Sequence, residues 1–106
     1  MDKREIIIEK VKAYRALVKS SFPIPVEQFY LFGSYAKGTS HKDSDIDVAL
    51  VVSHLSDDYD FLATEPLLWR LKRQVDCRIE PHVISRDSDY ASMLDEVKRT
   101  GIEVVD

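Results

Sequence analysis

The sequence predicts a small α/β (α+β) protein, in which helices pack on one face of a mixed β-sheet. Segments with apolar residues at helical spacing alternate with short segments rich in β-branched and aromatic residues. Of the 106 residues, 44% are hydrophobic and 9% aromatic, so we expect one core and a single domain spanning residues 1–106. Near the middle of the chain, a Gly-Ser turn joins two of the apolar segments and is followed by two aspartates spaced two residues apart.

Composition excludes several classes of protein. The formal net charge is -4, without the basic stripe that is typical of nucleic-acid binding, so we disfavour a polymerase that follows a template. Cys77 is the one cysteine, which rules out an internal disulfide and fits a reducing cytoplasm. No apolar run approaches the roughly 20 residues of a membrane span, and no signal-type segment opens the chain. We therefore expect a cytoplasmic protein that does not enter a membrane.

The first two elements are a helix and a strand. Residues 2–19 carry Ile7, Val11 and Tyr14 at helical spacing, which predicts an amphipathic helix that packs over the sheet. Two prolines follow and cannot continue this helix. Residues 26–32 are rich in β-branched and aromatic residues, and they predict the first strand.

The strand predicted at residues 46–52 carries a pair of carboxylates. Side chains alternate between the two faces of a strand, so Asp45 and Asp47 point the same way. The opposite face is apolar and faces the core: Ile46, Val48, Leu50 and Val52. Two carboxylates held side by side repel each other unless a cation lies between them. For a substrate that carries phosphates, the cation expected here is Mg²⁺.

The turn before that strand predicts a phosphate site. Gly33 has no Cβ, so the backbone can turn sharply and a ligand can approach closely. Ser34 offers a hydroxyl, and a short helix is expected from there to Gly38. Backbone N–H groups at a helix start suit phosphate oxygens. Lys37 could reach a triphosphate oxygen or could be an ordinary solvated lysine.

Two helices and two strands are predicted in the second half of the chain. A helix begins near Thr64, and a second helix carries an apolar stripe: Tyr90, Met93, Leu94 and Val97. Residues 102–104 alternate and predict a short edge strand or tail.

The predicted strand at residues 75–82 lies between those two helices. One face carries the charged residues Asp76, Arg78 and Glu80, and the other carries Val75, Cys77 and Ile79, which we expect to be buried. His82 follows a proline and has no evident partner in the sequence, so we expect a structural role for it.

The Gly33-Ser34 turn, ten residues, and then Asp45-x-Asp47 resemble the signature of the DNA polymerase β-like nucleotidyltransferase superfamily. The chain is most similar to its minimal nucleotidyltransferase (MNT) family, and the resemblance extends from about residue 26 to residue 102. The family's fold matches the predicted order of elements. A third carboxylate lies on a later strand in this family. Asp76 is the expected match, and Glu80, on the same strand face, remains open as a replacement or supplement.

The resemblance implies a Mg²⁺-dependent nucleotidyltransferase that transfers a nucleoside monophosphate, AMP from ATP, to a hydroxyl. It implies metal binding and catalysis by Asp45, Asp47 and Asp76, and phosphate binding by Gly33 and Ser34, with Lys37 as a further candidate. A chain of this size has no room for an acceptor-binding domain, so we expect a partner protein or self-association. Proteins of this family are often paired with a small helical HEPT protein, as antitoxin and toxin, so the resemblance implies such a partner. The alternative is a non-catalytic antitoxin that neutralises its partner by contact.

Overall fold

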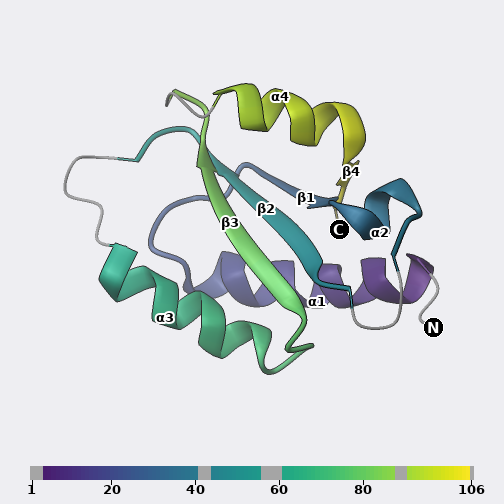
Figure 1. The fold of residues 1–106 in the computed structure, drawn as a ribbon. Coiled ribbons are helices and arrows are strands. Elements are labelled where there is room, and N and C mark those ends of the chain that lie inside the picture. Colours follow the sequence, from purple (N-terminus) through teal and green to yellow (C-terminus); the bar gives the residue numbers. More distant parts are fainter. Residues whose placement is uncertain (1–3, 41–43, 56–60, 88–90, 106) are drawn as a thin grey trace.

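The computed structural model describes residues 4–40, 44–55, 61–87 and 91–105. Within these ranges, helices and strands alternate along the whole chain (Figure 1). Their order is α1 (Arg4–Ser21), β1 (Gln28–Phe32), α2 (Ser34–Lys37), β2 (Ile46–Val52), α3 (Phe61–Lys72), β3 (Ile79–Ser85), α4 (Ala91–Thr100) and β4 (Ile102–Glu103).

The four strands form one mixed sheet in the order β3-β2-β1-β4. The pairings β1–β2 and β1–β4 are antiparallel, whereas β2 and β3 run parallel. The register places Phe32 of β1 and Glu80 of β3 on either side of Asp47 in β2. This arrangement confirms the predicted mixed α/β fold class.

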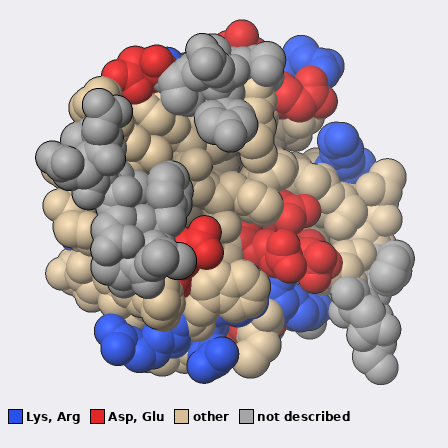
Figure 2. All heavy atoms as spheres, turned by 60° about the vertical axis from the view of Figure 1, so that its left-hand side comes forward, with Lys and Arg blue, Asp and Glu red and all other residues tan. Residues whose placement is uncertain are grey.

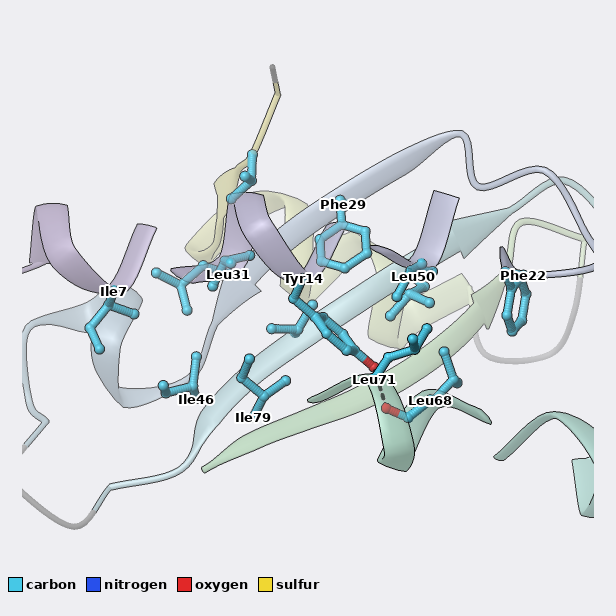
Figure 3. Close-up of a cluster of buried hydrophobic side chains, with 14 of the residues drawn as sticks. Ile7, Tyr14, Phe22, Phe29, Leu31, Ile46, Leu50, Leu68, Leu71 and Ile79 are labelled. Atoms are coloured by element: carbon cyan, nitrogen blue, oxygen red, sulfur yellow. Dashed lines mark hydrogen bonds between the residues drawn. The ribbon is translucent and has the colours of Figure 1, made fainter. Parts of the chain in front are cut away.

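Helices α1 and α3 cover one face of the sheet, as Figure 1 shows. Their apolar side chains pack against the core face of β2 in a cluster drawn in Figure 3. Tyr14 of α1 lies fully buried in this cluster, and its hydroxyl donates a hydrogen bond of 3.0 Å to the carbonyl of Leu68 in α3 (Figure 3). This bond gives the buried Tyr14 hydroxyl a partner, and it links the two helices.

Helix α4 packs on the other face of the sheet, which differs from the expectation that the helices share one face (Figure 1). Leu94 and Val97 contact the apolar residues there: Tyr30, Ala49, Val51 and Ile84. The reason is that β2 is apolar on both faces beyond Asp47, so both need a cover. Asp47, at the start of the same face, is half-buried.

Most predicted boundaries agree with the structure to within a few residues. The predicted strand at residues 46–52 coincides with β2, and α2 ends at Lys37 with Gly38 as its C-cap, as expected. Two predicted helix residues, Asp2 and Tyr90, lie outside the described residues. No helix among the described segments is both long enough and apolar enough to span a membrane.

The start of β3 was predicted four residues too early. The N–H groups of Gln74, Val75 and Asp76 still bond to carbonyls in the last turn of α3, so the chain is a turn there and β3 begins at Ile79. Consequently Cys77 is exposed rather than buried.

Candidate active site

Two carboxylates meet at the start of the parallel strand pair. Asp47 lies directly opposite Glu80 in the register between β2 and β3. Both residues are half-buried, so each keeps contact with solvent. Like charges directly opposite on neighbouring strands destabilise a sheet, and a divalent cation between them would remove that cost.

A glycine turn packs against Asp47 from the β1 side. Gly33 follows β1 directly and has φ of 75°, a left-handed backbone conformation that favours glycine. A Cβ added at Gly33 would lie 2.4 Å from Oδ2 of Asp47. The absence of a side chain at this position therefore lets the backbone that begins α2 approach the carboxylate.

His82 joins the two carboxylates from β3. It lies two residues after Glu80 on the same strand face, and the ligand atoms of Asp47, Glu80 and His82 lie within 4.8 Å of one another. Carboxylate oxygens and an imidazole nitrogen are ordinary ligands of divalent cations, so this donor set fits a metal ion. Sequence reasoning assigned His82 a structural role. Its even spacing from Glu80 was the signal that could have found it.

Asp76 lies apart from this group, in the turn that precedes β3. Its carboxylate accepts bonds from Lys10 Nζ at 2.8 Å and from three nitrogens of Arg78: N at 2.9 Å, Nε at 3.0 Å and Nη2 at 2.7 Å. The hydrogen bond from the Arg78 side chain, and that from Lys10, hold the pKa of Asp76 well below its ordinary value despite partial burial. The geometry thus brings Glu80, not the predicted Asp76, beside Asp47.

The ion pair of Asp76 also contacts the short helix that follows the Gly33 turn. Arg78 Nη1 donates a hydrogen bond of 3.1 Å to the hydroxyl of Tyr35, a buried residue of α2. From α1, Arg4 Nη2 donates a bond of 3.2 Å to the carbonyl of Ala36. Since both bonds end on α2, the turn that starts at Gly33 is held against α1 and the start of β3.

The other predicted site residues lie around this centre. Ser34 begins α2 and is half-buried, while Lys37 in its last turn is exposed. Asp45 is exposed just before β2 and lies outside the group of three ligand residues. The roles of these three residues stay predictions.

A pocket of about 220 Å³ lies next to the acidic group on its β3 side. It shares His82 with that group, and Pro81 and Val83 of β3 contribute to its wall. Helix α3 supplies Trp69, whose side chain is 39% exposed, and α4 supplies Met93. The pocket therefore offers an apolar and aromatic surface within reach of the carboxylates, on the side away from Gly33.

Figure 2 shows how charge is distributed on one face of the molecule. One cluster of acidic side chains lies near the middle of this face, further acidic side chains lie along its upper edge, and the Lys and Arg side chains stand in separate groups. Such a face suits a cation better than an extended polyanion, which would need a continuous basic surface.

The carboxylate pair on adjacent strands, with a glycine turn packed against it, is the candidate site of this fold. The family model of the nucleotidyltransferase domain matches residues 11–104 of this chain. The chain belongs to this family and is a nucleotidyltransferase, as the sequence resemblance implied.

The chain is also similar to individual proteins and to a solved structure. A protein of Methanocaldococcus jannaschii named as a protein adenylyltransferase is 29% identical over 98 residues, which cover 92% of this chain and 98% of the relative. The protein adenylyltransferase MntA of Shewanella oneidensis is 34% identical over 64 residues, which cover 60% of this chain and 43% of MntA. A crystal structure of a toxin–antitoxin with AMP-PNP is similar with a TM-score of 0.66 and 26% identity, covering 92% of this chain and 72% of that one.

Proposed function

We propose that this protein transfers AMP from ATP to a hydroxyl on a partner protein, and that it acts as the antitoxin of a toxin–antitoxin pair. The observation that carries the proposal is the placement of Asp47 opposite Glu80, with Gly33 packed against Asp47. The names of the two relatives support protein adenylylation, and the similar complex with AMP-PNP supports both the nucleotide and the toxin partner.

The carboxylates would hold the divalent cation, for which the sequence predicts Mg²⁺. Asp47 and Glu80 would bind it, with Asp45 as a further ligand and Glu80 in the role first predicted for Asp76. A bound cation supplies charge stabilisation at the α-phosphate and at the attacking and leaving oxygens.

Gly33 and Ser34 would receive the β,γ-phosphates, because the first N–H groups of α2 have no partners within the helix. Lys37 is the predicted cation for these phosphates. Held there, the nucleotide presents its α-phosphorus at Asp47, and the acceptor would enter from the β3 side, where the pocket lies.

The transfer forms one bond and breaks one. The acceptor oxygen bonds to the α-phosphorus, the bond from that phosphorus to the α,β-bridging oxygen breaks, and pyrophosphate leaves. The hydroxyl proton passes to water. The protein contributes positioning and electrostatic stabilisation, since this chemistry needs no covalent intermediate on a side chain.

The test uses ATP labelled at the α-phosphate, Mg²⁺ and a lysate of the source cells. We expect a labelled protein band with the wild type and none with Asp47→Asn. Asp95→Asn, the same exchange at an exposed position of α4, serves as the matched control and should label like the wild type.

Loss of label in Asp95→Asn as well, or full labelling by Asp47→Asn, would contradict the site. No label with any form, together with capture of the same partner by wild type and Asp47→Asn, would favour the alternative predicted from the sequence. In that alternative the protein neutralises its partner by contact alone.

A further inference from the structure

His82 carries an atom that the fold leaves without a hydrogen bond. Its Nε2 atom is buried, and it has no hydrogen-bond partner within the described part of the chain. Buried polar atoms in folded proteins are almost always bonded, and an exception calls for a reason. The nearest carboxylate oxygen, Oδ1 of Asp47, lies 3.5 Å away, beyond normal hydrogen-bond length.

Neighbouring residues fix the direction of this ring. Phe32 of β1 packs edge-on against the His82 ring, with 5.3 Å between the ring centroids. The register pairs His82 with Ala49, two pairs further along the sheet than the Asp47–Glu80 pair and on the same face. The imidazole is thus packed on one side and directs Nε2 toward Asp47.

The spacing of the three donors matches a shared cation. Two ligands bound about 2.1 Å from one ion are separated by at most about 4.2 Å. The ligand atoms of Asp47, Glu80 and His82 already lie within 4.8 Å of one another, so small side-chain rotations bring all three within binding distance of one ion. A cation would also satisfy the unpartnered Nε2 and offset the repulsion between the two carboxylates.

We propose that Nε2 of His82 is a direct ligand of the cation held by Asp47 and Glu80, and that the site therefore favours Mn²⁺ over Mg²⁺. The inference rests on the proposed function insofar as it places the cation at these carboxylates. Mg²⁺ selects oxygen ligands and water, whereas first-row transition-metal ions accept imidazole nitrogen readily. An oxygen-only site would discriminate less between the two ions.

Pulsed electron paramagnetic resonance of bound Mn²⁺ tests the nitrogen ligand directly. We expect a nitrogen hyperfine coupling in the wild type that is lost in His82→Gln and kept in His54→Gln. His54 is the matched control, because it is an exposed histidine that contacts Asp87. Wild-type protein labelled with ¹⁵N-histidine should change the coupling pattern, which tests the ligand without any substitution.

Competition between Mn²⁺ and Mg²⁺ gives the second readout. We expect Mn²⁺ to bind the wild type at least about tenfold more tightly than Mg²⁺, and His82→Gln to reduce that ratio by about tenfold. Asp47→Asn should abolish binding of both ions at this site.

The outcomes separate the two proposals. Mn²⁺ that binds only when Asp47 is present, but shows no histidine nitrogen, would overturn the role of His82 and leave the proposed function standing. Mn²⁺ binding that Asp47→Asn does not change would overturn the placement of the cation, and with it both proposals.

Discussion

Asp76 and Glu80 are four residues apart, yet their removal should have opposite consequences. We expect Asp76→Asn to destabilise the fold and leave transfer largely intact. Glu80→Gln should abolish transfer and leave the fold intact. Each exchange replaces a carboxylate by its amide, so any difference between the two variants reflects where the residue lies and not the type of substitution.

The cost at Asp76 follows from its four hydrogen bonds, three of which come from charged nitrogens of Lys10 and Arg78. Hydrogen bonds to charged groups contribute about 1.5–3 kcal/mol each to stability, but bonds that share one carboxylate do not add. The side chains of Lys10 and Arg78 are 32% and 26% exposed, so water replaces part of what is lost. We therefore expect the free energy of unfolding to fall by roughly 2–3 kcal/mol, or about 10–20 °C in Tm.

The contribution of the ionised Asp76 to the free energy of unfolding depends on pH. The pKa of Asp76 is lowered in the folded state, chiefly by Arg78, so the unfolded chain takes up a proton first as the pH falls. The stabilisation is present above the ordinary aspartate pKa of 3.8 and is lost progressively below it. The unfolding free energies of wild type and Asp76→Asn should differ at pH 7 and converge below about pH 4.

At Glu80, the exchange removes a like charge opposite Asp47. Stability should stay the same or rise by about 0.2–1 kcal/mol, because such pairs are repulsive. Transfer should fall by about 100-fold or more, since a metal site supplies several kcal/mol of charge stabilisation in the transition state. Denaturant unfolding and labelling from ATP, measured on the same preparations, provide the assay. An inactive but fully stable Asp76→Asn, beside an active Glu80→Gln, would refute the reasoning.

Two further substitutions test the turn and the pocket. Gly33→Ala should abolish transfer, because its Cβ would collide with Oδ2 of Asp47. Gly38→Ala has nearly the same φ, 77°, but ample space, so it should keep its labelling activity. Each exchange should lower the free energy of unfolding by about 1–3 kcal/mol, Gly33→Ala by more, because the ψ of -151° at Gly33 lies outside the left-handed helical region that Gly38 occupies. Trp69→Ala should weaken labelling of the partner protein without changing nucleotide binding, whereas Ile6→Ala, at an exposed apolar residue of α1, should affect neither. Equal loss of activity in the two glycine variants would count against the role of the Gly33 turn. Equal loss in Trp69→Ala and Ile6→Ala would count against the role of the pocket.

Local patterns in the sequence were sufficient for the parts of the site that lie on one continuous stretch. The alternation along residues 46–52 predicted β2 and the face that carries Asp47. Gly33, between two apolar segments, predicted the turn and the short helix α2. These features depend on steric limits and side-chain alternation within a few residues, so no distant contact is needed to predict them.

The partner of Asp47 was decided by tertiary structure. Alternation of Val75, Cys77 and Ile79 resembled a strand, but backbone hydrogen bonds from residues 74–76 to the end of α3 keep the chain in a turn before Ile79. With β3 beginning at Ile79, the parallel register with β2 places Glu80 beside Asp47. Asp76 lies in the preceding turn, where it forms ion pairs with Lys10 and Arg78. Alternation shows which side chains of a strand face the core, but it does not show which residue of a distant strand lies opposite each of them. That pairing depends on where β3 begins and on how both strands pack against the helices. The even spacing of His82 from Glu80 shows that the two share a strand face, but its proximity to Asp47 follows only from the pairing of β2 with β3.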